Sequence, residues 1–290
     1  MHGEIFVAKQ ATLYVVATPI GNLRDITLRA LDVLRTADII AAEDTRVTGS
    51  LLSSHGISTR VISTHRHNER ESAAGIVKLL AEGKSVALVS DAGTPGVSDP
   101  GAVAAAQAMA AGFDVVAVPG PSALCAALSV CGLSAPRICF TGFLPARQAQ
   151  RRELLASLAL EKGLQVFFEA PHRIEESVAD MIDAYGAQPR IAIARELTKL
   201  YEEVHQCALG EVPAWLRQRP ERMRGEFVVV VDSAGAGAEA AEAEANRVLG
   251  LLLDALPLKQ AVKLAADITG HKRNLLYQTA LAIKGAGAAR

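Results

Sequence analysis

Three groups of charged residues directly follow apolar runs of the chain, where an expected β-strand would end. They are Glu43-Asp44-Thr45-Arg46, Glu169-Ala170-Pro171-His172-Arg173 and Arg195-Glu196-Leu197-Thr198-Lys199. Clustered Arg, His and Lys side chains suit contact with a phosphate or a ribose, and Asp or Glu can orient a hydroxyl group. A structural salt-bridge network uses the same residue types, so that alternative stays open.

A fourth polar group, His65 to Glu69, contains two histidines two positions apart, which share one face if the segment is extended. Metal binding is a weak interpretation, because no third ligand is indicated and the neighbours are Arg66 and Asn68. We favour polar contact with a substrate and predict no metal. A solvated loop is the alternative.

Three Gly/Pro-rich loops, at 19–23, 91–101 and 119–123, also follow apolar runs. Ligands of open α/β sheets bind outside the carboxyl ends of the strands. In the longest loop, Pro95 and Pro100 restrict the backbone, whereas Gly93 and Gly96 allow a ligand to approach closely. One such loop would be a plain turn, but three at adjacent strand ends indicate a site.

Two nucleotide-binding motifs are excluded. Gly83-Lys84-Ser85 has Lys78 where a phosphate loop needs its first glycine, and it precedes a strand. No G-x-G-x-x-G follows the first apolar run. Exposed backbone amides and carbonyls without a phosphate cradle suit an adenosine and a sulfonium. Ser122 is expected to cap a helix, where its hydroxyl or nearby amides could meet a ribose or a carboxylate.

The elements that position these loops follow from the alternation of short β-branched runs with longer Ala/Leu segments. Expected strands cover 12–18, 38–43, 85–90 and 114–120, with helices at 26–37, 70–83 and 101–112. The pattern restarts with strands at 137–144, 164–170, 190–197 and 226–232 and helices at 151–160 and 174–185. We predict an α/β fold with a parallel-sheet N-terminal domain at 11–121 and a second α/β domain at 122–234.

The charge is unevenly distributed along the chain. Its 290 residues carry 30 Lys and Arg against 31 Asp and Glu, a net charge of −1. Residues 246–290 hold seven basic and two acidic residues, a local net charge of +5 that leaves −6 on the rest. After a Gly/Ala/Glu-rich linker at 235–245, we expect a basic helical unit at 246–290. It suits nucleic-acid binding, and a structural cap or a dimerisation element explains it equally well.

The composition excludes several classes of protein. Half of the residues are hydrophobic and four are cysteines without a C-x-x-C pair, which argues against disorder, a disulfide scaffold or a zinc site. Reduced thiols indicate a cytoplasmic protein. The first ten residues lack a secretory signal pattern, and polar residues interrupt the most apolar stretch, 101–119, so no membrane span is expected.

An ordered set of segments resembles one family. ATPIGNLRDITLRAL, EDTR, HRHNE, ALVSDAGTPGVSDPG, PGPSAL, GFLP, EAPHRI, ARELTK and RGEF are similar to the ribosomal RNA small-subunit methyltransferase I family, within the tetrapyrrole methylase superfamily. The resemblance covers about Leu13 to Asp232 and continues weakly into the C-terminal helices. It implies a two-domain tetrapyrrole-methylase-like fold with a mixed second domain and an enzyme that is usually a homodimer. The implied reaction methylates a cytidine ribose 2′-hydroxyl in the decoding region of 16S rRNA, with S-adenosyl-L-methionine as cofactor.

The resemblance also assigns residues. It places the cofactor against Asp91, Gly93, Thr94, Pro95, Val97, Ser122, Ala123, Phe168, Glu169, Leu197 and Glu226. It places RNA across Asn22, Asp44, Arg46, His67, Asn68, His172, Arg173, Arg195 and Lys199. Two positions depart from the family: Phe168 stands where Tyr is common, which puts a role for that hydroxyl in doubt, and RGEF replaces KGEF.

Methyl transfer to a hydroxyl is an in-line displacement, so alignment of the reacting atoms should supply most of the acceleration. A general base near the 2′-hydroxyl would add about 10²–10⁴-fold, and Asp44, His67 and Glu196 are the candidates. Two alternatives remain. A tetrapyrrole methyltransferase would have a Gly-rich first loop and no basic tail, and an RNA-binding assembly factor would bind RNA without regard to the cofactor.

Overall fold

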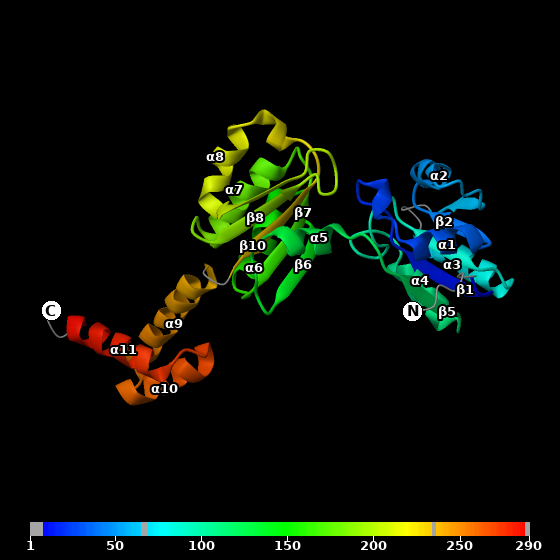
Figure 1. Cartoon of the computed structure of the whole chain (residues 1–290). Coiled ribbons are helices and arrows are strands. Elements are labelled where there is room, and N and C mark those ends of the chain that lie inside the picture. The colour runs from blue at the N-terminus through cyan, green and yellow to red at the C-terminus, as the bar shows by residue number, and fades with distance from the viewer. Residues whose placement is uncertain (1–7, 65–68, 234–235, 288–290) are drawn as a thin grey trace, which may run out of the picture.

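The computed structural model describes residues 8–64, 69–233 and 236–287, which form two α/β domains and a C-terminal helical unit (Figure 1). The first domain contains a parallel five-stranded sheet in the order β3-β2-β4-β1-β5. Its strands are β1 (Thr12–Val16), β2 (Ile39–Ala42), β3 (Val61–Ser63), β4 (Val86–Val89) and β5 (Asp114–Val118). Its helices are η1 (Leu23–Asp25), α1 (Leu28–Thr36), α2 (Thr45–Ser54), α3 (Glu69–Ala81) and α4 (Ala102–Ala110).

Helices cover both faces of this first sheet, as the continuous apolar strands predict. Residues of α1 and α2, such as Leu34 and Leu52, pack with Ile40 on one face. Residues of α3 and α4 pack with Leu13 and Leu88 on the other.

The three Gly/Pro-rich loops lie together at one edge of the first sheet. Val16 of β1 pairs with both Val89 of β4 and Val118 of β5, so the three strands end level. Thr18 and Gly93 then exchange backbone hydrogen bonds of 2.9 and 3.0 Å between the first two loops. The Thr94 hydroxyl donates to the Pro121 carbonyl at 3.2 Å, which ties in the third loop. The prediction that these loops are neighbours is confirmed.

The second domain has a mixed sheet in the order β6-β7-β10-β8-β9, in which β6–β7 is the one parallel pair of neighbours among the described strands. Its strands are β6 (Ile138–Phe143), β7 (Leu164–Glu169), β8 (Arg190–Arg195), β9 (Glu203–Ala208) and β10 (Phe227–Asp232). Helix α5 (Ala123–Val130) covers one face of this sheet, where it packs with Val166 of β7 and Val228 of β10. The other face packs on α6 (Gln148–Ala159), α7 (Ile174–Tyr185) and α8 (Val212–Arg217). The short helix η3 (Leu209–Glu211) directly precedes α8, and the short helix η4 (Pro220–Met223) follows it.

The C-terminal unit consists of α9 (Ala236–Ala255), α10 (Leu258–Thr269) and α11 (Arg273–Gly287) around its own small core, which includes Leu249, Val262 and Leu276. Figure 1 shows this unit beyond the second domain, on the side away from the first domain. The linker expected over 235–245 is wrong, because the chain is helical from Ala236 onward. Ala and Glu have high helix propensities, which here outweigh Gly237.

The sequence did not predict α2, β3 or β9. Helix α2 is rich in Ser and Thr, β3 is an edge strand of three residues, and β9 is a half-polar edge strand. Such segments give weak periodic signals because packing decides their structure. In the described part of the chain, no helix has the length and apolar character needed to cross a membrane.

Candidate active site

A cavity of about 350 Å³ lies between the first and second domains. Its first wall comes from the loops that follow β1, β4 and β5. Its second wall comes from the ends of β6, β7 and β8 and from the start of β10. Because β10 is antiparallel to β7 and β8, its start lies at the same edge as their ends. The cavity is therefore built where the strand ends of the two sheets face each other, and its volume is within the usual range for small-molecule sites.

Nine of the eleven residues predicted to hold the cofactor line this cavity. They are Gly93, Thr94, Val97, Ser122, Ala123, Phe168, Glu169, Leu197 and Glu226. The structure places Asp91 and Pro95 elsewhere in the same loop: the Asp91 carboxylate accepts a hydrogen bond from the Asp44 backbone at 2.9 Å, and Pro95 is buried. Ser122 occupies the N-cap position of α5, but its side chain makes no capping bond to that described helix.

Ten further lining residues were not assigned individually, although Ile20, Ala92, Ser98 and Asp99 belong to the loops expected to form the site. The others are Phe143, Ala170, Pro171, Ala194, Phe227 and Val228. A period of two along the strands was the available signal for part of this set. Val228 pairs with both Phe168 and Ala194, so these side chains share one face of the sheet. The antiparallel placement of β10 could not be read from its own sequence.

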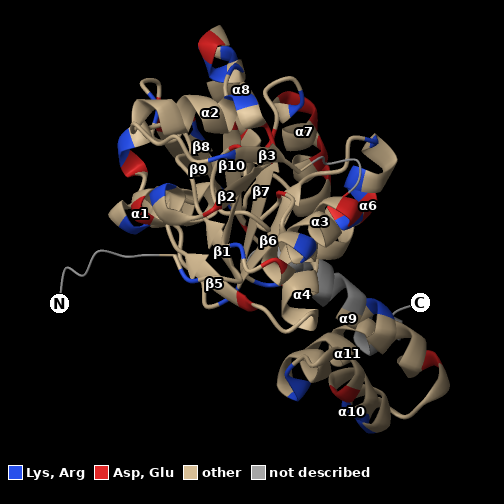
Figure 2. Cartoon of the chain, turned by 90° about the vertical axis from the view of Figure 1, so that its right-hand side faces the viewer, with Lys and Arg blue, Asp and Glu red and all other residues tan. Residues whose placement is uncertain are grey.

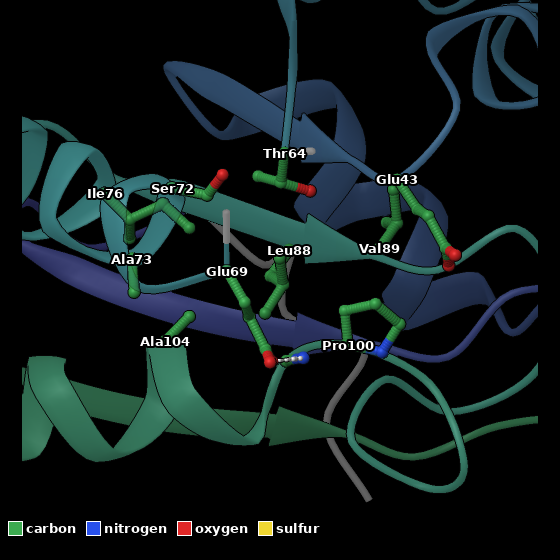
Figure 3. Close-up of a pocket in the computed structure, with 11 residues that line it drawn as sticks. Glu43, Thr64, Glu69, Ser72, Ala73, Ile76, Leu88, Val89, Pro100 and Ala104 are labelled. Carbon is green, nitrogen blue, oxygen red and sulfur yellow. Dashed lines mark hydrogen bonds between the residues drawn. The ribbon is translucent and has the colours of Figure 1, made fainter. Parts of the chain in front are cut away.

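The long loop after β4 is held in an unusual backbone conformation. Gly93, Gly96 and Gly101 have φ of 81°, 83° and 141°, and Ser98 has φ of 66°, which is rare for a residue with a side chain. The Glu69 carboxylate accepts a hydrogen bond from the Gly101 amide at 3.1 Å, at the start of α4 (Figure 3). Beside it, a hollow of about 20 Å³ is lined by Glu43, Thr64 and Glu69, enough for one water molecule. Glu69 therefore anchors the loop that forms the first wall.

Glu169 is the buried polar group of the second wall. Only 1% of this residue is exposed, and its carboxylate accepts hydrogen bonds from the Ala170 amide at 2.8 Å and from the Ser177 hydroxyl. The Arg173 guanidinium lies 3.4 Å from the same carboxylate and donates to the carbonyls of Leu144 and Pro145. Arg173 thus joins two loops of the second domain through its Nη2 hydrogen bonds, whereas the neighbouring His172 is exposed.

Glu196, Lys199 and Glu226 form a charged cluster at the cavity rim. The Lys199 ammonium lies 2.8 Å from Glu196 and 3.0 Å from Glu226, and the Glu226 amide donates to Glu196 at 3.0 Å. Burial opposes both charges. Even so, the hydrogen bond from Lys199 lowers the pKa of Glu196, and those to Glu196 and Glu226 raise the pKa of Lys199. The cluster presents a cation whose partner carboxylate is held ionised.

This cluster is packed against both domains. Glu196 and Thr198 have positive φ angles of 52° and 66°. A Cβ at Gly225 would lie 2.4 Å from the Glu196 side chain, and one at Gly21 would lie 2.5 Å from Lys199. Both glycines are therefore needed for close approach, and the Gly21 contact joins the loop after β1 to the second domain. Strain that a structure maintains in this way is characteristic of functional sites.

Asp44 and Arg46 form a pair outside the cavity lining. Asp44 caps α2, and its carboxylate lies 2.6 Å from the Arg46 guanidinium. The Arg46 side chain and its backbone amide donate to this carboxylate and lower the pKa of Asp44 to about 2. Asp44 is consequently ionised at neutral pH and is a weak base. The Arg46 side chain is 89% exposed, so solvent screens the pair.

Four other residues predicted to contact RNA or act as a base are not part of the Asp44–Arg46 pair. Asn22 is exposed and caps η1. Arg195 is buried and donates to the carbonyls of Tyr201, Glu221 and Arg224, so the structure does not bring it to the cavity surface. His67 and Asn68 lie outside the described residues. In the described part of the chain, no three His, Cys, Asp or Glu side chains gather as a metal site requires.

Comparisons with known proteins define the class. Residues 12–213 match the protein-family model described as Tetrapyrrole (Corrin/Porphyrin) Methylases. The fold is similar to a cobalt precorrin-4 methyltransferase, with a TM-score of 0.57, 18% identity and coverage of 77% of this chain and 95% of that one. It is also similar to uroporphyrin-III-C-methyltransferase from Thermus thermophilus, with a TM-score of 0.55, 19% identity and coverage of 79% and 98%. The chain thus belongs to this class of methylases and has their fold.

Curated relatives narrow the class. Ribosomal RNA small subunit methyltransferase I of Pseudomonas aeruginosa is 50% identical over 276 residues, covering 94% of this chain and 98% of the relative. The protein of the same name from Escherichia coli O157:H7 is 46% identical over 276 residues, covering 95% and 96%. Residues 239–284 match the family model described as RsmI C-terminal HTH domain. The chain belongs to the ribosomal RNA small subunit methyltransferase I family, as the sequence motifs predict.

The cofactor of this family is S-adenosyl-L-methionine, and the cavity fits it. The lining is apolar at Phe168, Ala194 and Leu197, as an adenine requires. Ser122, Thr94 and the loop backbone supply polar groups for a ribose and an amino acid, and no phosphate cradle is needed.

Proposed function

We propose that this chain transfers a methyl group to the 2′-hydroxyl of a cytidine ribose in the decoding region of 16S rRNA. The observation that carries the proposal is the cavity between the domains, which has an apolar second wall and the charged cluster Glu196–Lys199–Glu226 at its rim. The relatives named for small-subunit rRNA methylation support the choice of substrate.

The two walls bind and orient the cofactor in this proposal, and S-adenosyl-L-methionine supplies an activated methyl group when bound. The loop at 91–101 holds one side through Gly93, Thr94 and Val97, anchored by Glu69. Phe168 and Leu197 hold the other side. Because hydrogen bonds and packing fix both walls, the domain pair can align the reacting atoms for in-line transfer, and orientation is its main catalytic contribution.

The charged residues have different tasks in this proposal. Asp44 and Glu196 both have lowered pKa values, so neither is tuned as a general base for neutral pH. Of the two, Glu196 adjoins the cavity rim through Glu226. We assign Glu196 the task of orienting Lys199, which carries a positive charge that can contact an RNA phosphate or the reacting hydroxyl.

RNA would approach polar and basic side chains outside the cavity. Arg46 and His172 are exposed and Lys199 is partly exposed, and the C-terminal unit adds the exposed Lys259, Lys263 and Lys272. Figure 2 shows basic residues on the helices of the C-terminal unit. Such side chains neutralise phosphates and make binding depend on salt. Arg173 and Arg195 contribute indirectly, because they hold the loops that carry His172 and Lys199.

A homodimer in the cytoplasm is part of the proposal. Large apolar side chains are exposed in both domains: Leu28 of α1 is 81% exposed, and Leu200 and Tyr201, which follow Lys199, are 88% and 68% exposed. Exposed apolar side chains of this size are available for an interaction surface. Light scattering during size-exclusion chromatography would report twice the mass of the chain if this part is correct, and the monomer mass would contradict it.

The function is tested by methyl transfer from labelled S-adenosyl-L-methionine to small ribosomal subunits that lack the modification. We expect label on the ribose of one cytidine and none on a tetrapyrrole substrate offered in parallel. Label on a base, on the tetrapyrrole alone, or on neither substrate would contradict the proposal. Calorimetry that detects no cofactor binding would favour the assembly-factor alternative.

A further inference from the structure

Phe143 is an aromatic side chain at the cavity mouth whose exposure is unusual for its type. It lines the cavity and is 55% exposed. A phenylalanine in an ordinary core position would be mostly buried, because each side chain of this size gains roughly 1.5–3 kcal/mol on burial. The neighbouring Leu144 is 2% exposed, so a buried position is available one residue away.

An irregularity in β6 places the ring there. Phe140 pairs with Val166, and Phe143 pairs with Phe168, so three steps along β6 match two steps along β7. Thr141 is the extra residue of a β-bulge. In a regular strand, residues three apart point to opposite faces, whereas the bulge brings Phe140 and Phe143 to the same face. Bulges that re-aim a side chain are common next to active sites.

Gly142 makes this bulge possible. It has φ of 76°, and a Cβ on it would lie 2.9 Å from the Ser98 hydroxyl of the opposite wall. Any larger residue would strain the backbone and press against the loop at 91–101. The bulge and the first wall of the cavity are thus fitted to each other.

The Phe143 ring is held in place by its neighbours. Its centroid lies 5.7 Å from that of Phe168 with an interplanar angle of 70°, and Phe168 in turn lies 4.9 Å from Phe140 at 65°. Edge-to-face contacts of this kind fix a ring without covering both of its faces. Phe168 lies between the other two rings, and Phe143 is the most exposed of the three.

We propose that Phe143 is a stacking platform for the base of the nucleotide that is methylated. The inference deepens the proposed function and rests on it. A folded rRNA cannot enter a cavity of about 350 Å³, so the acceptor ribose must meet the methyl group at the mouth. The base attached to that ribose then lies within one nucleotide of the exposed ring. Proteins that read unpaired nucleotides hold them by such aromatic stacking.

The test compares Phe143→Ala, Phe143→Leu and Phe143→Tyr with the wild-type chain. Steady-state methyl transfer to unmodified small subunits gives KM and kcat, and calorimetry gives the Kd for S-adenosyl-L-methionine. Ile138→Ala is the matched control, because Ile138 is a 48% exposed residue at the other end of the same strand. Thermal unfolding of each variant reports on the fold.

We expect Phe143→Ala to raise KM for the small subunit by about 5- to 150-fold, the loss of one base–aromatic stack. Phe143→Leu keeps apolar volume without a ring, so its KM should be close to that of the alanine variant. The KM of Phe143→Tyr should stay close to that of the wild-type chain. Because Phe143 also lines the cavity and contacts Phe168, cofactor Kd should change by much less than KM does. Ile138→Ala should match wild type in both quantities.

Three results would overturn the assignment. An unchanged KM in Phe143→Ala would show that the ring does not contact the RNA. A cofactor Kd that weakens with the subunit KM would assign the ring to the cofactor instead. A leucine variant equal to wild type would show that apolar volume suffices. A wild-type chain inactive on rRNA would overturn the proposed function itself, so the two failures are distinguishable.

Discussion

Replacing Glu69 by alanine would release the loop that forms the first wall of the cavity. In the structure, the Glu69 carboxylate accepts from the Gly101 amide at 3.1 Å, and Gly101 is the N-cap of α4 without a side chain of its own to cap the described helix. Glu69→Ala leaves this amide without its protein acceptor. A hydrogen bond to a charged group contributes about 1.5–3 kcal/mol, so this is the free energy at stake.

The loss of the hydrogen bond between Glu69 and Gly101 should appear mainly as weaker cofactor binding. Gly101 closes the loop at 91–101, and Val97, Ser98 and Asp99 of this loop line the cavity. If the cofactor must order a loosened loop, about 1.5–3 kcal/mol corresponds to a Kd weakened by roughly 10- to 150-fold. Glu69→Gln keeps a neutral acceptor and should weaken Kd by about 10-fold at most.

Isothermal titration calorimetry with S-adenosyl-L-methionine measures this directly, and thermal unfolding shows whether the variants stay folded. The neighbouring Glu71→Ala serves as the matched control, because Glu71 is an exposed residue of the same helix turn. A Kd for Glu69→Ala equal to that of the wild-type chain, with the fold intact, would refute the reasoning that Glu69 positions the wall.

Three further predictions follow from charges in the structure. Asp180→Ala should lower the free energy of unfolding by about 3 kcal/mol in a denaturant titration, because it removes the nearer carboxylate of buried Arg151, whose Nε lies 2.7 Å from Asp180 with both residues 1% exposed, and leaves only the exposed Glu176 at 3.5 Å. Burial opposes the charge of Asp180, but hydrogen bonds from Arg152, Arg151 and Gln148 lower the pKa of this carboxyl group. Its stabilising effect is therefore present above the unfolded pKa of about 4 and is lost as pH falls through the lower folded pKa. Arg46→Ala should raise KM for the small subunit and leave cofactor Kd unchanged; equal loss of both would contradict its place on the RNA side. Removing residues 246–290 should weaken RNA binding and flatten its dependence on salt; an unchanged slope would mean that the unit is a structural cap.

Residue types and spacing predicted much of the site because backbone geometry follows from them. Gly93, Pro95 and Pro100 indicated a shaped loop, and the apolar runs before it indicated parallel strands that end at one edge. These are local properties of the chain, and a parallel sheet brings the loops together independently of how the side chains pack.

The direction of long side chains was not predictable in the same way. Arg173 and Arg195 stand beside the site in sequence, but their guanidinium groups turn to backbone carbonyls up to 29 residues away. The bulge at Thr141 and the position of β10 also depend on pairing between distant strands. Helix α2 was missed because its Ser and Thr residues favour other conformations, and burial of Leu51 and Leu52 decides the outcome.

The central claim is that this chain methylates one cytidine ribose of 16S rRNA. Its most direct test is mass-spectrometric mapping of 16S rRNA from cells with the protein, without it, and with a Lys199→Ala variant. We expect one ribose methylation in the decoding region to be present with the protein, absent without it and strongly reduced with the variant. An identical modification map in the presence and absence of the protein would contradict the account.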